Sequence, residues 1–557
     1  MRFILLLLMV TSLFGLDEAK VKKEIGHMLI VGFEDSHVDK DSKIIKQIQK
    51  YELGGVILFD RFYEDRNRTK NISSPKQLQA LTSTLKKFAK KPFFIAVDQE
   101  GGKVARLKPK YGFIKIPSAY KVAQLPLKKA KSIYKKQAKM LHVNGINCDF
   151  APVVDLAINP KNRVIVGLER SYSKDPSKVV QYASTCRDAL RAEGVVSVLK
   201  HFPGHGSSVG DSHEGLVDVS DTWSEMELQP YKALIKADKA DMIMTAHVYN
   251  KNLDKKYPAT LSYSVNTKLL REKLGFKGVI VSDDMQMSAI AKLYSLEDAV
   301  TLAINSGVDM LLFGNQLKNQ SVDKIIDVIY QQVKSGAIAY ERIQEANRKI
   351  AILHTKRSIV QKPIRFQKER ITMTKKYIAK HYGMAVEDIK IEPKMIVLHW
   401  TAMMSFHDSF DRLYPQKLLS DRKDISKASA LNVSAHFLVD RDGTIYQLMP
   451  DNWMARHVIG LNYSAIGVEN VGGKANKKED LTPEQLQANV ALVRYLKDKY
   501  PTIKYLIGHF EYRTFENSSL WLEKDKGYRT IKADPGKKFM KSVREHVKDL
   551  ELSGAYE

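Results

Sequence analysis

The stretch VVSVLKHFPGHG, residues 195–206, joins an unbroken apolar run to a polar, glycine-containing segment. A run that is apolar at successive positions, and not only at alternate ones, is typical of a parallel strand buried on both faces. Lys200 and His201 stand where this strand would end, and the glycines that follow allow a tight, irregular loop. The stretch therefore predicts a strand of an α/β protein with ionisable groups at its carboxyl end.

Similar apolar runs lie on both sides of this stretch, with helical patterns between them. Eight are found between residues 28 and 313: MLIVGF (28–33), GVILF (55–59), FFIAVD (93–98), INCDFAPVVD (146–155), VVSVLK (195–200), DMIMTAH (241–247), GVIVSD (278–283) and VDMLLF (308–313). Eight strand-helix units in series predict a TIM-like (β/α)8 barrel. Because the carboxyl ends of barrel strands open onto one mouth, we expect the polar side chains that follow them to share a pocket.

The pattern changes after about residue 355. Residues 356–392 are basic and lack a buried-strand signal, so we expect a linker with connecting helices there, its charge lying on a solvated face. Further on, MIVLHW (395–400), AHFLVD (435–440) and IGVENVGG (466–473) predict strands, and the capping-box sequence TPEQ (482–485) predicts the start of a helix. We therefore expect a barrel domain over 17–355 and a separate mixed α/β domain over 393–557.

The first sixteen residues, MRFILLLLMVTSLFGL, place one arginine before an apolar run and end ahead of an acidic, polar segment. This pattern predicts a secretory signal peptide over 1–16, which is either cleaved or retained as an anchor. No later segment has the twenty or so apolar residues that a transmembrane helix needs, so we expect no span in the mature chain. The protein is accordingly expected to be exported, to the periplasm or envelope.

Length and composition exclude several classes of protein. The chain has 557 residues, 44% of them hydrophobic, which is too long for a single small module and too apolar for global disorder. Two cysteines cannot build a disulfide framework. The net charge of +26 would suit an anionic partner, but no basic stripe is interleaved with aromatics, so we expect no nucleic acid. Nothing in the sequence indicates an oligomeric state.

The loop after residue 200 contains the first group of residues with catalytic potential. Asp211 and His213 are separated by one residue, so in an extended loop they can face the same way, and the carboxylate can hold an imidazole tautomer. Asp283 ends another predicted strand. A glycosidase needs a carboxylate at the anomeric carbon and an acid at the leaving oxygen. Asp283 suits the first role and the Asp211/His213 pair suits the second.

Four motifs then support a resemblance: DQEGGKVAR (98–106), GLERSYSKDP (167–176), KHFPGHG followed by DSH (200–213), and VSDDM (281–285). In this order they resemble those of bacterial family-3 β-N-acetylglucosaminidases that trim peptidoglycan fragments. The resemblance implies that Asp283 is the nucleophile, that Asp211 and His213 form the acid/base dyad, and that this domain needs no cofactor. It also implies that the sugar hydroxyls and N-acetyl group are held by Asp98, Arg106, Arg170, Lys200 and His201.

The later domain contains a second group. His399, His509 and Asp534 are two imidazoles and a carboxylate, a set that can bind one zinc ion and leave a fourth position for water. Glu469 is available as a general base for that water, and Lys532 could stabilise an oxyanion. Two distant histidines and an aspartate are by themselves a weak signal for a metal site.

The surrounding motifs strengthen this interpretation: VLHWTAM (397–403), SAHFLVDRDGTIYQLMP (434–450), SAIGVENVGG (464–473), GHFEY (508–512) and KADPG (532–536). They resemble the zinc N-acetylmuramoyl-L-alanine amidases related to phage lysozyme-type amidases and peptidoglycan recognition proteins. The resemblance implies the metal and catalytic roles given above. Two departures are Ala435, where some relatives have a catalytic tyrosine, and a long segment, 510–533, expected to form a lip with Trp521, Tyr528 and Arg529. His436 and His457 are interpreted as supporting residues and not as ligands.

Together the two halves predict a bifunctional hydrolase of peptidoglycan or muropeptides. One domain would release GlcNAc from GlcNAc-(anhydro)MurNAc by a retaining mechanism, and the other would cleave the MurNAc–L-Ala amide with one Zn²⁺. The alternative is a peptidoglycan-binding or scaffold protein with only one active hydrolase domain. The catalytic and metal-ligating residue types expected of each domain are present, which favours the bifunctional interpretation.

Overall fold

The computed structural model describes residues 17–89, 92–211 and 215–556. These fall into two compact units, one ending at Arg357 and the other beginning at Ser358. The expected signal peptide, residues 1–16, and His213 lie outside the described residues. No helix of the described ranges is both long enough and apolar enough to cross a membrane.

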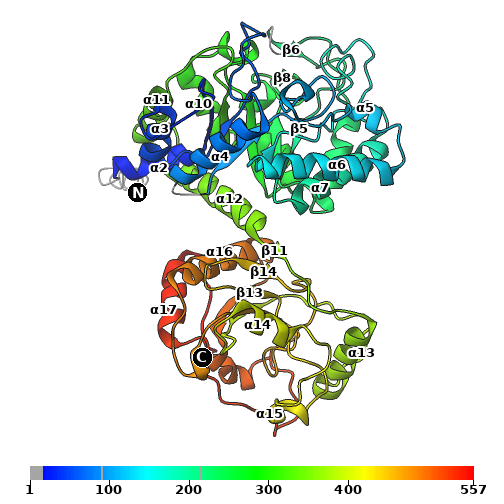
Figure 1. Ribbon diagram of the computed structural model, residues 1–557, viewed down its shortest axis with the longest axis vertical. Coiled ribbons are helices and arrows are strands. Elements are labelled where there is room, and N and C mark those ends of the chain that lie inside the picture. Colours follow the sequence, from blue (N-terminus) through cyan, green and yellow to red (C-terminus); the bar gives the residue numbers. More distant parts are fainter. Residues whose placement is uncertain (1–16, 90–91, 212–214, 557) are drawn as a thin grey trace, which may run out of the picture. The chain divides into compact units, whose positions relative to one another are not determined.

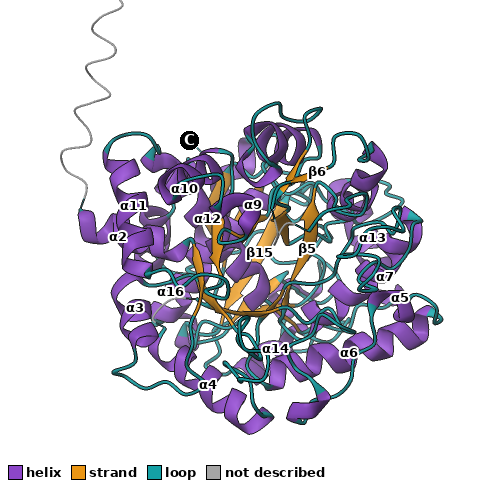
Figure 2. Cartoon of the chain, turned by 90° about the horizontal axis from the view of Figure 1, so that it is seen from above, coloured by secondary structure: helices purple, strands orange, loops and turns teal. Residues whose placement is uncertain are grey.

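The first unit is a closed barrel of eight parallel strands, as predicted (Figures 1 and 2). Around the barrel the strand order is β1, β10, β9, β7, β5, β4, β3 and β2. The strands are β1 (Leu29–Gly32), β2 (Gly55–Ile57), β3 (Phe94–Val97), β4 (Cys148–Asp149), β5 (Val196–Phe202), β7 (Met242–Thr245), β9 (Val279–Asp284) and β10 (Met310–Phe313). The β5 segment is buried at every position, which is why its sequence is apolar without alternation.

Helices surround the barrel on its outside and bury their apolar faces against the strands (Figure 2). The larger ones are α2 (Glu18–His27), α3 (Lys43–Tyr51), α4 (Pro75–Phe88), α6 (Leu127–Val143), α7 (Pro176–Ala192), α8 (Gln229–Lys236), η5 (Ser264–Lys273), α10 (Leu296–Asn305), α11 (Val322–Lys334) and α12 (Tyr340–Ser358). A short ribbon of β6 (Val217–Asp218) and β8 (Val248–Tyr249) lies in the loops that follow β5 and β7. The loops at the carboxyl ends of the strands are thus held on a rigid core.

The second unit contains a six-stranded mixed sheet in the order β11, β14, β13, β15, β12, β16. Its strands are β11 (Val360–Gln361), β12 (Met395–Leu398), β13 (Phe437–Val439), β14 (Ile445–Gln447), β15 (Ala465–Asn470) and β16 (Tyr505–Gly508). All neighbours are parallel except β13 and β14. The main helices are α13 (Lys368–Tyr377), α14 (Phe406–Leu413), α16 (Pro483–Lys499) and α17 (Lys537–His546). The predicted capping box at Thr482 is formed with Gln485 and starts α16.

The structure corrects the description of residues 356–392 as a linker. From Ser358 onward this segment belongs to the second unit: β11 pairs with β14, and α13 continues into η6 (Ile378–Tyr382). Tyr377, Ile378 and Tyr382 are almost completely buried in the core of that unit. The sequence hid this because the buried aromatic and aliphatic residues lie among exposed lysines such as Lys376 and Lys380, and because Arg370 is itself buried.

Candidate active sites

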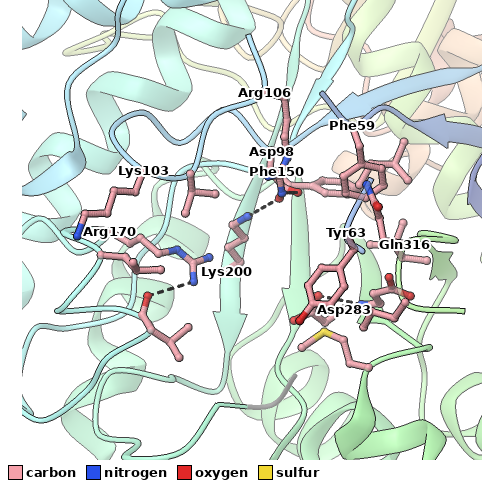
Figure 3. Close-up of a pocket in the computed structure, with 18 of the residues that line it drawn as sticks. Phe59, Tyr63, Asp98, Lys103, Arg106, Phe150, Arg170, Lys200, Asp283 and Gln316 are labelled. Atoms are coloured by element: carbon pink, nitrogen blue, oxygen red, sulfur yellow. Dashed lines mark hydrogen bonds and ion pairs between the residues drawn. The ribbon is translucent and has the colours of Figure 1, made fainter. Parts of the chain in front are cut away.

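The predicted barrel residues meet in one pocket at the carboxyl ends of the strands. Its volume is about 320 Å³, and Figure 3 shows several of its side chains pointing into the same space. The lining includes Asp98, Arg106, Arg170, Lys200, His201, Asp211 and Asp283, each expected from the sequence to belong to the site. Closure of the barrel brings these residues together, because residues almost two hundred positions apart in the sequence follow strands of the same ring.

The centre of this pocket is an ion-paired network around Lys200. The ammonium lies 2.9 Å from the carboxylate of Asp98, which also accepts a hydrogen bond of 3.0 Å from Arg106. Burial alone would raise the pKa of Asp98, but Lys200 and Arg106 outweigh it and hold that pKa below its ordinary value. The network presents fixed charges and fixed hydrogen-bonding groups, which suit the orientation of a polyol.

Glu100 is a second carboxylate of this network that the sequence did not single out. It is buried, accepts two hydrogen bonds of 2.7 and 2.8 Å from Arg170, and lies 2.8 Å from Lys200. Its pKa is lowered, because Arg170 and Lys200 outweigh the opposing effect of burial. The sequence feature that could have identified Glu100 is its position two residues after Asp98, in a segment with no further acidic residue.

His201 is held by Asp155, which lies after β4. The imidazole Nδ1–H donates to Asp155 at 2.7 Å, and Nε2 lies 3.3 Å from a guanidinium nitrogen of Arg170. Because the guanidinium can only donate, Nε2 accepts and the ring is the Nδ1–H tautomer. Asp155 also accepts the backbone N–H of His205, so one buried carboxylate fixes both the ring and the start of the following loop.

Two further side chains hold that loop. Asn162 donates to the carbonyl of His205 at 2.7 Å, and Glu227 accepts the N–H of Gly206 at 2.8 Å. Burial raises the pKa of Glu227 to about 7. Gly206 leaves no room for a side chain, since a Cβ there would lie 2.0 Å from the carbonyl of Leu156. The base of the loop that carries Asp211 is therefore held by Asn162, by Glu227 and by close packing against the backbone of Leu156.

Asp283 lies at the end of β9 and accepts the N–H of Asp284 at 2.8 Å. Figure 3 shows Tyr63 beside it and Phe59 and Gln316 close by, all on the same side of the pocket. These three were not predicted, because aromatic and amide residues outside a recognisable motif resemble ordinary core residues in sequence. Asp284 also lines the pocket, and its carboxylate accepts the N–H groups of Gln286 and Gly314.

The second unit brings His399, His509 and Asp534 together at the carboxyl ends of β12 and β16. The two Nδ1 atoms lie 3.0 Å apart, and one oxygen of Asp534 lies 2.9 Å from Nδ1 of His509 and 3.3 Å from Nδ1 of His399. Burial lowers the pKa of His509 to about 4, so the ring is neutral and can offer a lone pair. Three buried donor atoms that converge in this way fit a zinc ion.

Glu469 and Lys532 stand next to this cluster. Glu469 is on β15, beside β12, and its buried Oε2 has no hydrogen-bond partner among the described residues. Burial raises the pKa of Glu469 to about 7, an effect that His399 and Lys532 reduce and Asp534 increases. A carboxylate with this pKa can take up and release a proton near neutral pH.

Of the three residues expected on the lip in segment 510–533, Trp521 and Arg529 are partly exposed and Tyr528 is not. Tyr528 is buried and its hydroxyl accepts a hydrogen bond from Arg456. The Arg529 guanidinium lies over the ring of Trp521 at 4.7 Å and pairs with Glu516 at 3.2 Å. Ile531 is the most exposed large hydrophobic side chain of the described residues, at 94%. These contacts hold the segment against its own domain, and its expected place over the cleft stays a prediction.

Fold and geometry together define a hydrolase with two sites, a carboxylate-containing barrel pocket and a His/His/Asp cluster. Residues 20–353 match the family model of the glycosyl hydrolase family 3 N-terminal domain, and residues 390–537 match that of N-acetylmuramoyl-L-alanine amidase. The chain therefore belongs to glycosyl hydrolase family 3, and it carries an amidase domain in its C-terminal region. Both resemblances expected from the sequence are confirmed.

Individual relatives agree with the barrel assignment. The chain is 35% identical over 338 residues to β-hexosaminidase A of Pseudoalteromonas piscicida, a match that spans 56% of this chain and 54% of that protein. It is 39% identical over 269 residues to the β-hexosaminidase of Tolumonas auensis, covering 47% of this chain and 76% of the relative. The crystal structure of a family-3 glycosyl hydrolase from Mycobacterium smegmatis is similar with a TM-score of 0.52 at 28% identity, covering 61% of this chain and 98% of that one.

Proposed function

We propose that this protein is a bifunctional peptidoglycan hydrolase that releases GlcNAc from GlcNAc-(anhydro)MurNAc and cleaves the MurNAc–L-Ala amide. The observation that carries the proposal is that one chain contains two separate groups of residues, each suited to one bond of the same polymer. Tethering two such sites raises the effective concentration of each on a shared fragment. We further propose that the protein is exported, on the basis of residues 1–16.

In the barrel, the ion-paired network of Asp98, Lys200 and Arg170 would orient the terminal sugar. Asp283 would attack the anomeric carbon while the Asp211/His213 pair protonates the leaving oxygen, so that a covalent glycosyl-enzyme forms as the glycosidic bond breaks. The same pair would then accept a proton from water, which attacks the anomeric carbon and releases Asp283. Retention of configuration follows from the two displacements.

In the second unit, His399, His509 and Asp534 would hold zinc, which when bound acts as a Lewis acid that makes water more acidic. Glu469 would take the proton of the attacking water and return it to the leaving amide nitrogen. The Lys532 ammonium would stabilise the negative charge that develops on the carbonyl oxygen. Burial of the cluster strengthens each of these electrostatic effects, because the local dielectric is low.

The alternative is a peptidoglycan-binding protein in which only one domain is active. The two proposals are separated by assaying one preparation on two substrates: a chromogenic β-GlcNAc glycoside and a muramoyl peptide without GlcNAc. The bifunctional proposal predicts turnover of both, with amide cleavage alone lost in His399→Ala. Turnover of a single substrate, with unchanged binding of the other, would support the alternative.

A further inference from the structure

His457 lies directly behind His399, on the side away from the cluster formed with His509 and Asp534. Its Nδ1 is 3.0 Å from Nε2 of His399, and the two rings are almost perpendicular, at 84°. The other nitrogen of His457 is 3.3 Å from the carbonyl oxygen of Ala465, at the start of β15. The residue is partly buried within the second unit.

The carbonyl group settles the direction of the hydrogen bonds. A carbonyl oxygen can only accept, so Nε2 of His457 carries the hydrogen, and in a neutral ring Nδ1 then has a lone pair. Nδ1 faces Nε2 of His399 at 3.0 Å, so one of these two nitrogens donates and the other accepts, and the lone pair of Nδ1 makes it the acceptor. His399 must therefore donate through Nε2, which leaves the lone pair of its Nδ1 facing His509 and Asp534.

We propose that His457 is a positioning residue that fixes the tautomer and ring orientation of His399. The Ala465 carbonyl is the last acceptor in this series of hydrogen bonds. A ligating histidine commonly donates its second ring N–H to a carboxylate, carbonyl or water. Here that acceptor is another imidazole. The backbone carbonyl determines which nitrogen of His457 carries the hydrogen, and His457 in turn determines that Nδ1 of His399 keeps its lone pair. The inference deepens the proposed amidase function and rests on the metal assignment made there.

The surrounding chain holds His457 in place. Its backbone N–H donates to the side-chain oxygen of Asn462 at 2.8 Å. Gly467, paired with Val397 of β12, leaves room for the ring, since a Cβ there would lie 2.7 Å from it. The geometry is therefore imposed by β15 and the preceding loop, and it does not depend on the three expected ligands.

His436 provides a matched control. It is fully buried, and its ring lies 5.9 Å from that of His457. Its Nε2 donates to the carbonyl of Trp453 at 2.7 Å, and its Nδ1 accepts the N–H of Gly467 at 2.9 Å. Both of its hydrogen bonds are thus to the backbone, so its replacement reports the general cost of losing a buried histidine.

The test measures zinc affinity of the full chain by chelator competition in His457→Leu, His457→Asn and His436→Leu. Asn and Leu have nearly the same shape, but Asn can place an acceptor oxygen where Nδ1 of His457 stands. We expect His457→Leu to weaken zinc binding by roughly 10- to 100-fold and His457→Asn to retain most of the affinity. His436→Leu should lower the melting temperature of the metal-free protein without a comparable loss of zinc affinity.

Equal zinc affinities in His457→Leu and His457→Asn would overturn the proposal, as would an equal loss in His436→Leu. If His457→Leu does not fold, His457→Met, which also lacks a strong acceptor, is compared with His457→Asn in the same way. A wild-type chain without zinc affinity would refute the metal assignment instead, so the two failures are distinguishable.

Discussion

Replacing Glu100 by glutamine tests whether the network in the barrel pocket holds the site together. Glu100 is only 7% exposed and its two oxygens face Arg170 and Lys200. Glutamine keeps the shape of the side chain and one acceptor oxygen. It removes the charge, however, and turns an amide NH₂ group toward cations that can only donate.

The magnitude follows from the burial of the partners. Removing one member of a buried ion pair typically costs about 3–5 kcal/mol, because the other charge is left uncompensated. Since glutamine retains one acceptor, we take the lower end, about 3 kcal/mol of unfolding free energy. At roughly 2 °C per kcal/mol for a domain of this size, the barrel should melt about 6 °C lower. Less firmly held Arg170 and Lys200 should also reduce kcat/KM for GlcNAc release by about tenfold.

The thermal stability of the barrel domain is measured as the glycosidase activity that remains after heating. Amide cleavage in the same samples serves as an internal reference. Asp221→Asn is the matched control, because it removes the same charge from an exposed ion pair with Lys251 and should change stability by less than about 0.5 kcal/mol. Equal thermal stabilities of Glu100→Gln and Asp221→Asn would refute the reasoning about the buried network.

Four further predictions follow from the two sites. Asp283→Asn should abolish GlcNAc release and leave amide cleavage intact, and any retained glycosidase turnover would place the nucleophile elsewhere. Chelation should stop amide cleavage and spare GlcNAc release, as assayed before and after zinc is returned. Glu469→Gln should lower kcat for amide cleavage by roughly 10²–10⁴ at full zinc content; an unchanged rate would remove Glu469 from the mechanism. The pKa values of Asp98 and Glu100 are lowered in the fold, so their contribution to stability is complete above pH 4.5 and is lost as the pH falls further. The rate of heat inactivation should therefore rise at acid pH. This rise should be smaller in Glu100→Gln, which lacks one of the two titrating groups.

Most of the barrel was predictable because burial on both faces leaves an unambiguous signal in each strand. The run at 195–200 is an example, since every position of β5 is buried. The segment 356–392 was not predictable in the same way. Its buried residues Tyr377, Ile378 and Tyr382 are interleaved with exposed lysines, and short strand β11 gains its pairing only from β14, far along the chain.

The site residues can likewise be divided into those that the sequence predicted and those that it did not. Residues within recognisable motifs, such as Asp98 and Lys200, were predicted and do meet in the pocket. Glu100 and Asp155 were not assigned roles, because their importance lies in contacts with Arg170 and His201, residues brought close only by closure of the barrel. The roles of Asp283 and Glu469 in the reactions stay predictions that the variants above test.

The most direct test of the bifunctional proposal is mass spectrometry of a purified GlcNAc-anhydroMurNAc-peptide incubated with the wild-type chain, with Asp283→Asn and with His399→Ala. The account predicts that the wild type releases both free GlcNAc and free stem peptide, that Asp283→Asn releases only the peptide, and that His399→Ala releases only GlcNAc. Absence of either product from the wild-type digest, or loss of both products in one variant, would contradict it.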